Sequence, residues 1–179
     1  MSKLIILRGN SGSGKSSAAK ALQRKFGRNT MVISQDIVRR EMLWVKESEG
    51  NPALPLLIEL LKYGAAHCPV VILEGILNTE THMPLFEAAI DEFGDRIFAY
   101  YYDLPFEETL RRHETKQNRF DFGEEHMRKW WKEKDFIHII PETVLTKDVS
   151  LEDAVNQIYS GITGLQKLRN FSVMLLREK

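Results

Sequence analysis

The stretch GNSGSGKSS, from Gly9 to Ser17, decides the fold of this chain. It contains the pattern G-x-x-x-x-G-K-[ST], in which Gly9, Gly14, Lys15 and Ser16 hold the fixed positions, and it directly follows the apolar run KLIILR. Glycine lets the backbone curl so that successive N–H groups point at an anion, and a helix that begins here adds its positive end. The pattern therefore predicts a phosphate-binding loop of the Walker A type between a buried strand and a helix.

The residues of this loop have expected roles in nucleotide binding. We expect Lys15 to stand exposed over the loop and reach the terminal phosphates, and we expect the Ser16 hydroxyl to ligate Mg²⁺. The candidate nucleotide-binding residues are Gly9, Asn10, Ser11, Gly12, Ser13, Gly14, Lys15, Ser16 and Ser17, and the candidate metal ligand is Ser16.

Size and composition limit the possible functions. The 179 residues suffice for one compact domain, and an apolar fraction of 43% is typical of an ordered globular chain. The 25 basic and 25 acidic residues give a formal charge of zero, which argues against strong binding to duplex DNA. The single cysteine, Cys68, allows no internal disulfide, and no apolar run approaches the ~18 residues of a membrane span. We expect one domain over residues 1–179 and a cytoplasmic location.

Strand-like and helix-like segments alternate along the chain. The expected strands are residues 4–7, 31–34, 70–73, 97–102 and 144–146, and the expected helices are residues 14–26, 36–45, 56–66, 85–93, 105–110 and 151–162. The alternation predicts an α/β three-layer sandwich around a mainly parallel sheet of five strands. Ligands of such sheets bind beyond the carboxyl ends of the strands, where Ser34, Asp36, Glu74 and Asp103 lie.

The segment LIILRGNSGSGKSSAAKAL, residues 4–22, resembles the start of the P-loop kinases that phosphorylate small molecules or polynucleotide ends. This branch contains polynucleotide 5′-hydroxyl kinases, gluconate kinase, chloramphenicol phosphotransferase and zeta-toxin-like kinases. The similarity is strong over residues 3–40 and looser to about residue 160, and residues 165–179 have no counterpart in it. The resemblance implies a P-loop NTPase fold with a helical lid, and ATP and Mg²⁺ as ligands.

The second strand end reads ISQDIVRREM, and its Asp36 stands 20 residues after Ser16. In the kinases that the chain resembles, an aspartate here accepts the proton of the acceptor hydroxyl, and an arginine three residues later holds the acceptor. Asp36 and Arg39 have this spacing, and residues i and i+3 share one face of a helix. The alternative is that Asp36 caps a helix and the arginines lie on its surface.

The third strand end, VVILEGIL, carries Glu74. Many P-loop proteins have a Walker B carboxylate on such a strand, where it holds Mg²⁺ directly or through water. The usual form ends in aspartate, so Glu74 departs from the pattern. The role of Glu74 stays open: it contacts metal, water or substrate, or it is a charged residue at a strand end that faces solvent.

The charged stretch RRHETKQNRFDFGEEHMRKWWKEKD, residues 111–135, resembles the arginine-bearing lid of these kinases. Such a lid closes over the transferring phosphoryl group and adds positive charge where negative charge develops. We place the lid at about residues 113–135 and expect Arg112 and Arg119 to be catalytic, with Arg111 and Lys116 behind them. The alternative is a solvated helix face whose charges pair with one another.

Two tryptophans, Trp130 and Trp131, lie in the same stretch. Their large apolar surfaces favour packing of the segment on the core, and stacking on a base is the alternative. The five histidines and Cys68 show no spacing typical of metal ligands.

Together these features predict an ATP-dependent kinase whose acceptor is a hydroxyl of a small-molecule or nucleoside-like compound. The expected catalytic residues are Lys15, Asp36, Arg112 and Arg119, and the expected substrate-binding residues are Asp36, Arg39 and Glu74. A polynucleotide 5′-hydroxyl kinase stays open, as does a non-catalytic protein that binds a nucleotide or sequesters a ligand. We expect a small-molecule partner and no membrane, and the neutral charge disfavours nucleic acid.

Overall fold

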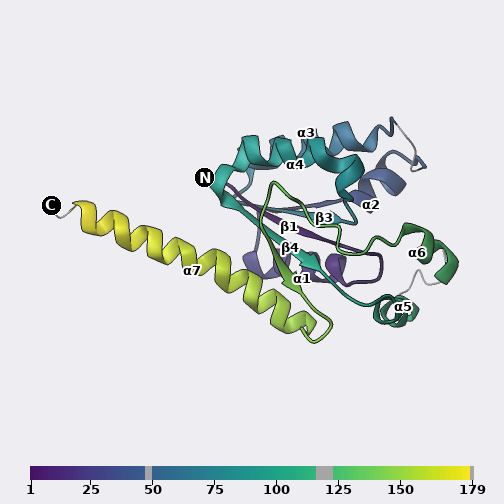
Figure 1. Cartoon of the computed structure of the whole chain (residues 1–179). Coiled ribbons are helices and arrows are strands. Elements are labelled where there is room, and N and C mark those ends of the chain that lie inside the picture. The colour runs from purple at the N-terminus through teal and green to yellow at the C-terminus, as the bar shows by residue number, and fades with distance from the viewer. Residues whose placement is uncertain (47–49, 116–122, 178–179) are drawn as a thin grey trace.

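The computed structural model describes residues 1–46, 50–115 and 123–177, and the side chains of the last helix up to residue 164. The strands are β1 (Lys3–Gly9), β2 (Thr30–Ser34), β3 (Val70–Gly75), β4 (Ile97–Tyr102) and β5 (Glu142–Leu145). They form one parallel sheet in the order β2-β3-β1-β4-β5 (Figure 1). The predicted five-stranded parallel sheet is confirmed, and each expected strand overlaps an observed one.

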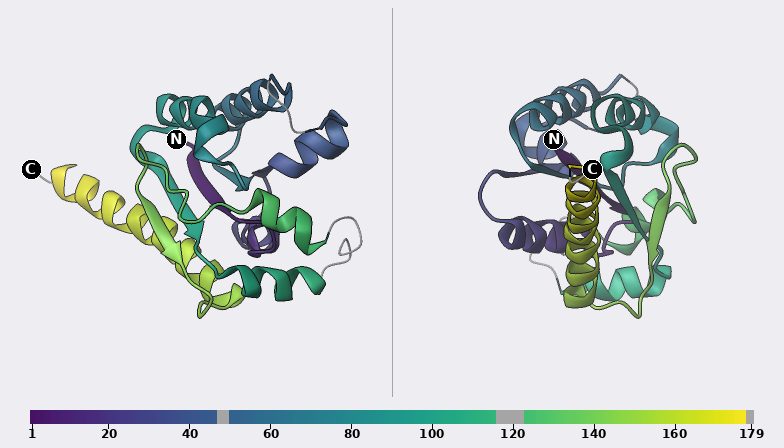
Figure 2. Two further views of the ribbon diagram at one scale, coloured as in Figure 1. Left: turned by 45° about the vertical axis from the view of Figure 1, so that its right-hand side comes forward. Right: turned by 90° about the vertical axis from the view of Figure 1, so that its left-hand side faces the viewer.

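Helices cover both faces of this sheet (Figure 2). They are α1 (Lys15–Phe26), α2 (Gln35–Ile37), α3 (Ala53–His67), α4 (Thr79–Phe93), α5 (Phe106–Glu114), α6 (Glu124–Trp130) and α7 (Leu151–Arg177), with a π-helical turn, η1 (Val38–Met42), and a 3₁₀ turn, η2 (Gly94–Arg96). The predicted three-layer sandwich is confirmed.

The first strand is apolar from Leu4 to Leu7 because both of its faces are buried. Leu4 and Ile6 belong to the core under α3 and α4, whereas Ile5 and Leu7 belong to the core under α1 and α7. Side chains alternate between the two faces of a strand, so one short run contributes to both cores.

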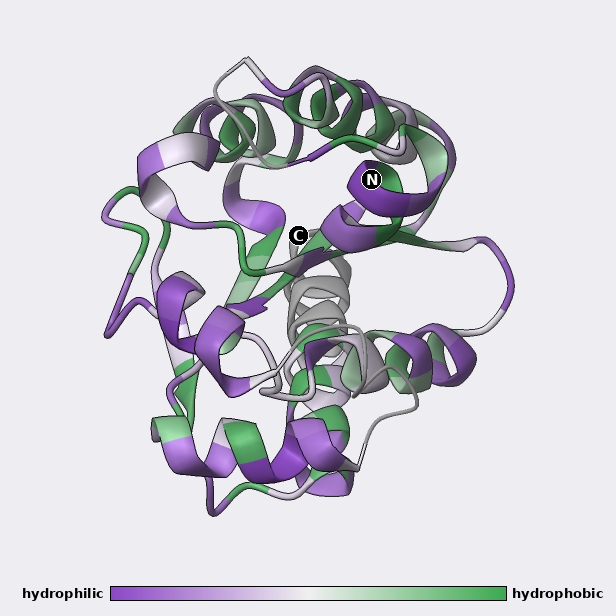
Figure 3. Cartoon of the chain, turned by 90° about the vertical axis from the view of Figure 1, so that its right-hand side faces the viewer, coloured by the Kyte–Doolittle hydropathy of each residue, from purple (hydrophilic) through white to green (hydrophobic). Residues whose placement is uncertain are grey.

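The register of the strands gathers the predicted functional segments at one edge. Glu74 of β3 pairs with Leu7 of β1 and with Ser34 of β2, and Tyr102 of β4 pairs with Gly9 at the end of β1. Parallel strands end at the same edge, so the loop, α2 and the end of β4 lie next to one another there. Figure 3 looks toward this edge and shows both hydrophilic and hydrophobic residues on the helices that surround it.

Two helices near this edge differ from the prediction. α4 begins at Thr79, six residues before the expected residue 85, because the Asn78 side chain accepts a hydrogen bond from the N–H of Thr81 and caps the helix. The helix expected over residues 36–45 consists of α2 and η1, and the N–H of Leu43 donates to the carbonyl of Val38, five residues back, at 3.1 Å. Such π-helical turns widen a helix locally and are frequent at functional sites.

The last helix, α7, is longer than the sequence predicts and projects from the body of the molecule (Figure 1). Its first half packs on the sheet and α1 through Ala154, Val155, Ile158 and Ile162. No helix in the described part of the chain is long and apolar enough to cross a membrane.

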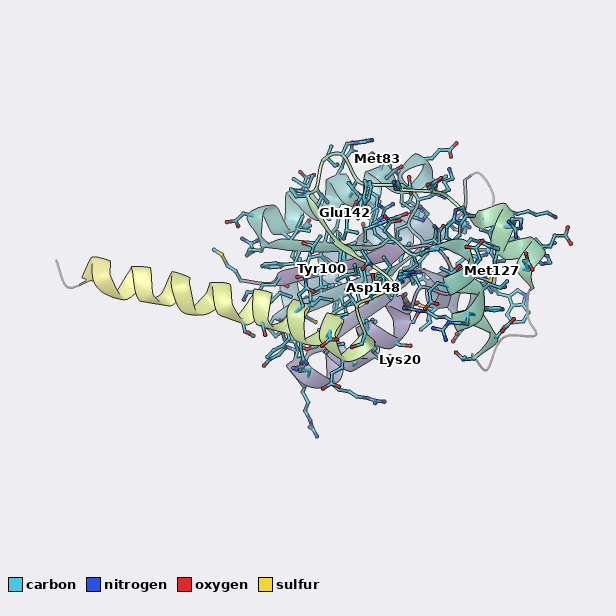
Figure 4. All side chains as sticks on the ribbon, turned by 60° about the horizontal axis from the view of Figure 1, so that its bottom comes forward. Lys20, Met83, Tyr100, Met127, Glu142 and Asp148 are labelled. Atoms are coloured by element: carbon cyan, nitrogen blue, oxygen red, sulfur yellow. The ribbon has the colours of Figure 1, made fainter. Side chains whose placement is uncertain are left out.

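A fully buried arginine secures the strand that leads into the loop. Arg8 donates to the carbonyl of Leu77 at 2.8 and 3.2 Å, and it pairs with Asp135 at 2.8 Å and with Glu142 at 3.3 Å. Burial raises the pKa of Glu142, and the positive charge of Arg8 opposes this rise. A buried guanidinium needs such partners. The network ties β1 to β5, where Glu142 lies within the body (Figure 4), and to the segment that follows α6.

Candidate functional site

Three glycines of the loop have backbone angles that other residues rarely adopt. The φ angles of Gly9, Gly12 and Gly14 are 134°, 84° and 101°. A Cβ on Gly12 would lie 2.4 Å from the carbonyl oxygen of Thr109, and one on Gly9 would lie 2.7 Å from that of Tyr102. These glycines therefore allow both the curvature of the loop and its close contact with α5 and β4. α1 begins directly after Gly14, so its N-terminus faces the loop.

The Lys15 side chain lies inside the loop and is 7% exposed. Its ammonium donates to the carbonyl of Asn10 at 2.8 Å and to the hydroxyl of Ser13 at 3.1 Å. The expectation of an exposed Lys15 is wrong, because a buried ammonium needs oxygen acceptors and the curled loop supplies them. The positive charge is thereby held at the centre of the predicted phosphate site.

Ser16 and Glu74 meet where α1 begins and β3 ends. The Ser16 hydroxyl donates to Oε2 of Glu74 at 3.0 Å, and Glu74 is 4% exposed. A strand end that faces solvent is therefore the wrong interpretation of Glu74. Mg²⁺ prefers oxygen donors and takes few protein ligands beside phosphates, so this hydroxyl and carboxylate fit that ion. Among the described residues, no group of three or more His, Cys, Asp and Glu could form a metal site from side chains alone.

An open cleft lies between the loop and the α2–η1 segment. This α2 cleft has a volume of about 560 Å³. Its lining residues are Ser11, Gly12, Lys15, Ser16, Gln35, Asp36, Arg39, Arg40, Glu74, Gly75, Ile76 and Trp130. The structure thus brings Asp36, Arg39 and Glu74 together with the loop, and five ionisable side chains face one cleft.

A second cleft lies on the side of the loop that faces α5 and the start of α7. This α7 cleft has a volume of about 690 Å³. Its lining residues are Gly12, Ser13, Gly14, Ser17, Tyr102, Arg112, Thr115, Val149, Ser150 and Leu151. Among the described residues of this lining, Arg112 is the one charged side chain, and Tyr102, Val149 and Leu151 give the cleft apolar surface.

The parallel sheet, the loop and the two clefts can now be compared with known proteins. A family model described as an AAA domain matches residues 4–134. The chain belongs to this AAA domain family. No curated protein sequence matches the chain.

Three solved kinase structures share the fold of this AAA domain at low identity. A gluconokinase from Sinorhizobium meliloti 1021 has a TM-score of 0.69 at 15% identity, over 95% of this chain and 97% of that one. The Mycobacterium tuberculosis APS kinase in complex with AMPPNP and APS has a TM-score of 0.60 at 20% identity, over 89% and 96%. The Acinetobacter baumannii shikimate kinase in complex with shikimate has a TM-score of 0.60 at 19% identity, over 92% and 94%. These similarities show the P-loop kinase fold.

Asp36 of the AAA domain stands at the mouth of the α2 cleft with its carboxylate 67% exposed. Its Oδ1 lies 3.4 Å from Nη2 of Arg39 and 3.2 Å from Nε of Arg40. The residue that precedes α2 is Ser34, so Asp36 does not cap this helix and that alternative is wrong. Sequence reasoning missed Arg40, although its position four residues after Asp36 is a signal that could have found it.

The residue before Asp36, Gln35, is buried and connects neighbouring elements through its side-chain amide. The Oε1 atom of Gln35 accepts from the N–H of Leu77 at 3.1 Å, and its Nε2 lies 3.0 Å from Nε2 of His82. A Cβ on Gly75 would lie 2.5 Å from Gln35 Oε1. This amide joins the ends of β2 and β3 to the start of α4, and no local sequence pattern marks a glutamine for such a role.

Arg112 of α5 lines the α7 cleft and joins its own helix to the loop and to the segment before α7. Its guanidinium donates to Glu108 at 2.6 Å, to the carbonyl of Ser13 in the loop at 3.0 Å, and to the carbonyl of Lys147 at 3.5 Å. Hydrogen bonds from Arg111 and Arg112 lower the pKa of Glu108 to about 2. The structure thus places Arg112 against the loop from its α5 side.

The other predicted lid cations are placed differently. Arg111 pairs with Glu108 at 2.8 Å and lines neither cleft. Arg119 and Lys116 lie outside the described residues. Asp103, at the end of β4, also lines neither cleft, and its N–H donates to the carbonyl of Leu145 at 3.0 Å.

Within the predicted lid, α6 and the residues directly after it contact the phosphate-binding loop. The side-chain amide of Asn10 donates to the carbonyl of Lys132 at 2.7 Å and accepts from its N–H at 3.0 Å. Met127 is buried, and a Cβ on Gly12 would lie 3.3 Å from its Cε. Figure 4 shows Met127 on α6, at the end of the molecule that carries the clefts. The loop therefore sets the position of α6.

Trp130, the last residue of α6, and Trp131, which follows it, have different surroundings. Trp131 packs edge-on against Phe106 of α5 with ring centroids 5.2 Å apart. Phe106 belongs to neither apolar core, so Trp131 joins α6 to α5 and the expected packing on the core stays a prediction. Trp130 instead lines the α2 cleft beside the loop. Sequence reasoning missed this role, because the direction of each ring depends on how α6 is seated on the loop.

Proposed function

We propose that this AAA domain is an ATP-dependent phosphotransferase that transfers the γ-phosphoryl group to a hydroxyl of a small-molecule acceptor. The position of the loop between the two clefts supports this function above all. The nucleoside of ATP occupies the α7 cleft, its phosphates occupy the loop, and the acceptor occupies the α2 cleft beside Asp36. Donor and acceptor then meet at Lys15, which lines the α2 cleft.

The residues of the α2 cleft suit the transfer step. The acceptor oxygen forms a bond to the γ-phosphorus, the bond from that phosphorus to the β–γ bridging oxygen breaks, and the proton of the hydroxyl passes to Asp36. Arg39 orients the acceptor. Most of the catalysis is positioning and charge stabilisation, because the protein makes no covalent bond to the phosphoryl group.

The loop residues hold the phosphates of the donor. Lys15 contacts the β- and γ-phosphates, and Ser16 ligates Mg²⁺ with Glu74 behind it. When bound, Mg²⁺ neutralises charge that develops on the phosphate oxygens. Arg112 brings a further positive charge to the loop through its bond to the Ser13 carbonyl, and the same catalytic role is proposed for Arg119.

The names of the similar structures support a small acceptor. One is a gluconokinase, one is a kinase with APS and AMPPNP bound, and one is a kinase with shikimate bound.

A panel of hydroxyl compounds tests this function, with ATP, Mg²⁺ and ADP release as the measurement. We expect ADP release to depend on one class of acceptor and on Mg²⁺. Lys15→Ala abolishes this release, whereas Lys20→Ala, on the exposed side of α1, leaves it unchanged (Figure 4). Wild-type turnover in Lys15→Ala would show that the loop is not catalytic. Equal ATP hydrolysis with and without every acceptor would favour a nucleotide-dependent switch.

A polynucleotide 5′-hydroxyl kinase is the second candidate, because two arginines line the α2 cleft. Arg39 and Arg40 both lie beside Asp36, and guanidinium groups bind phosphate well. An oligonucleotide with a free 5′-hydroxyl, included in the same panel, distinguishes this candidate from a small-molecule kinase.

A further inference from the structure

Tyr102 lines the α7 cleft, and its buried hydroxyl forms no hydrogen bond with the described residues. Tyr102 ends β4, and its side chain belongs to the core between the sheet, α1 and α7. The residue is 6% exposed, and its hydroxyl has no hydrogen-bond partner among the residues that the structure describes. Buried polar groups in native proteins are nearly always paired, so an isolated one calls for an explanation.

The two preceding tyrosines show that this environment is particular to Tyr102. The hydroxyl of Tyr101 accepts a hydrogen bond from the N–H of Asp135 at 3.3 Å. Tyr100 lies on the same sheet face as Tyr102 and in the same core, but it lines neither cleft. Of the three, Tyr102 alone combines a buried hydroxyl without a described partner and a place in the lining of a cleft.

The cleft that Tyr102 lines suits one part of a nucleotide. Gly12, Ser13 and Gly14 of the loop form one side of it, and Val149 and Leu151 add apolar surface. A nucleoside attached to phosphates in the loop brings flat apolar faces together with base and ribose atoms that form hydrogen bonds. Such a ligand can cover the cleft beside Tyr102. The hydroxyl oxygen has less than 1 Å² of accessible surface in the free protein, so its hydrogen bond to the ligand requires the Tyr102 side chain to turn toward the cleft.

The protonation state of the Tyr102 hydroxyl also suits a hydrogen bond to a nucleoside. Burial raises the pKa of Tyr102 to about 12, and the nearby positive charge of Arg112 opposes this rise. The hydroxyl is therefore neutral near pH 7 and can both donate and accept a hydrogen bond.

We propose that the Tyr102 hydroxyl binds the nucleoside of the phosphoryl donor, through a base-edge atom or a ribose hydroxyl, and thereby contributes to donor selection. This inference rests on the proposed function, in which the α7 cleft holds the donor. It assigns to Tyr102 a recognition contact.

Tyr102→Phe tests this contact, because it keeps the ring and removes the oxygen. We expect AMPPNP with Mg²⁺ to bind ~2- to 10-fold more weakly by isothermal titration calorimetry, the effect of one lost hydrogen bond. Without nucleotide, Tyr102→Phe should have a Tm equal to or above that of the wild type, since no contact in the free protein is lost. Tyr100→Phe is the matched control on the same strand face, and we expect it to bind AMPPNP as the wild type does.

Nucleotide analogues locate the partner atom. We expect one of three analogues, 2′-deoxy-ATP, 3′-deoxy-ATP or the triphosphate that lacks the adenine amino group, to bind the wild type more weakly than ATP does. The same analogue should show no such loss with Tyr102→Phe, because the atom that it lacks then has no partner.

Three results would overturn the proposal. In the first, Tyr102→Phe binds AMPPNP with wild-type affinity. In the second, its Tm falls by several degrees while its affinity is unchanged, which would show that the free protein already satisfies the hydroxyl. In the third, the wild type itself binds no nucleotide, which would remove the proposed function as well, whereas the first two leave that function standing.

Discussion

The α2 cleft and the α7 cleft share one loop and differ in chemistry. Of the residues that the structure describes, five ionisable side chains line the α2 cleft, whereas the α7 cleft has Arg112 alone as a charged side chain. Proton transfer and charge stabilisation need ionised groups close to the reacting atoms, and a nucleoside needs apolar surface with a few polar contacts. This difference supports the proposal that the acceptor and the transfer step occupy the α2 cleft and the nucleoside occupies the α7 cleft.

The two clefts are also supported differently. Under the α2 cleft, Gln35 is fixed through its contacts to Leu77 and His82, so the residue before Asp36 has a set position. In the α7 cleft, Arg112 joins the loop to α5 and to the carbonyl of Lys147, so one side chain holds three segments together. A change on one side should therefore leave the function of the other side largely intact.

The largest effect is expected for a substitution that removes catalysis in the α2 cleft and leaves nucleotide binding in the α7 cleft intact. Asp36→Asn keeps the shape of the side chain and removes its ability to take a proton. With the acceptor that the panel identifies, we expect the rate of ADP release to fall ~10²- to 10⁴-fold while the affinity for AMPPNP stays unchanged. Asp103→Asn, at a strand end outside both clefts, is the matched control. Wild-type turnover in Asp36→Asn would remove Asp36 from the mechanism.

An intermediate effect is expected for acceptor binding. Arg39→Ala should raise the KM for the acceptor ~10- to 100-fold, the usual effect of losing a hydrogen bond to one charged group, and leave AMPPNP binding unchanged. Arg24→Ala, on the exposed side of α1, is the control. An equal loss of AMPPNP affinity would contradict the separation of the two clefts.

The salt dependence of kcat/KM in the same assay distinguishes a small acceptor from an oligonucleotide. For a small acceptor we expect kcat/KM to depend weakly on salt beyond its effect on ATP, given the zero formal charge of the chain. A steep log–log slope with an oligonucleotide acceptor would instead support the polynucleotide kinase, because salt competes with phosphate contacts.

The smallest expected effect concerns the ion pairs at the edge of the α7 cleft. The pKa of Glu108 in the folded protein is about 2, below the ~4.3 of an unfolded chain, so its bonds to Arg111 and Arg112 stabilise the fold above pH ~4.3 and are lost as the pH falls toward about 2. Glu108→Gln should lower the Tm at pH 7 by no more than ~2–4 °C, since exposed ion pairs contribute little.

The pH dependence of the Tm difference between the wild type and Glu108→Gln tests the direction of the pKa shift of Glu108. The gap between the wild type and Glu108→Gln should narrow as the pH falls from 5 toward 2, measured by differential scanning calorimetry. Glu107→Gln is the control for removing one carboxylate from α5. A gap that widens on acidification would contradict the lowered pKa of Glu108.

Much of the fold could be predicted because its signals are local. Three glycines of the loop have positive φ angles, and the apolar run before them has two buried faces. Both features are typical of a loop that follows a strand of a parallel sheet. The start of α4 was missed, although the cap at Asn78, one residue before Thr79, is itself a local signal for the start of a helix. The extent of α7 was missed as well.

The candidate site could be predicted in part. Asp36, Arg39 and Glu74 lie in one cleft with the loop, at strand ends that the predicted topology already brings to one edge. The burial of Lys15 could not be predicted, because it depends on where the carbonyl of Asn10 points after the loop has curled. The same holds for Gln35, whose partners are 42 and 47 residues away in the chain.

By itself, the sequence determined the phosphate-binding loop, the alternation of strands and helices, and the edge of the sheet at which ligands meet, because these follow from the freedom of glycine and the period of apolar residues. Only the tertiary structure decided which neighbour in a pair faces a cleft. Trp130 lines the α2 cleft while Trp131 packs on Phe106, and Tyr102 lines the α7 cleft while the hydroxyl of Tyr101 binds the backbone of Asp135. Adjacent residues of one type carry the same local signal, and the distant segments packed against them determine their roles.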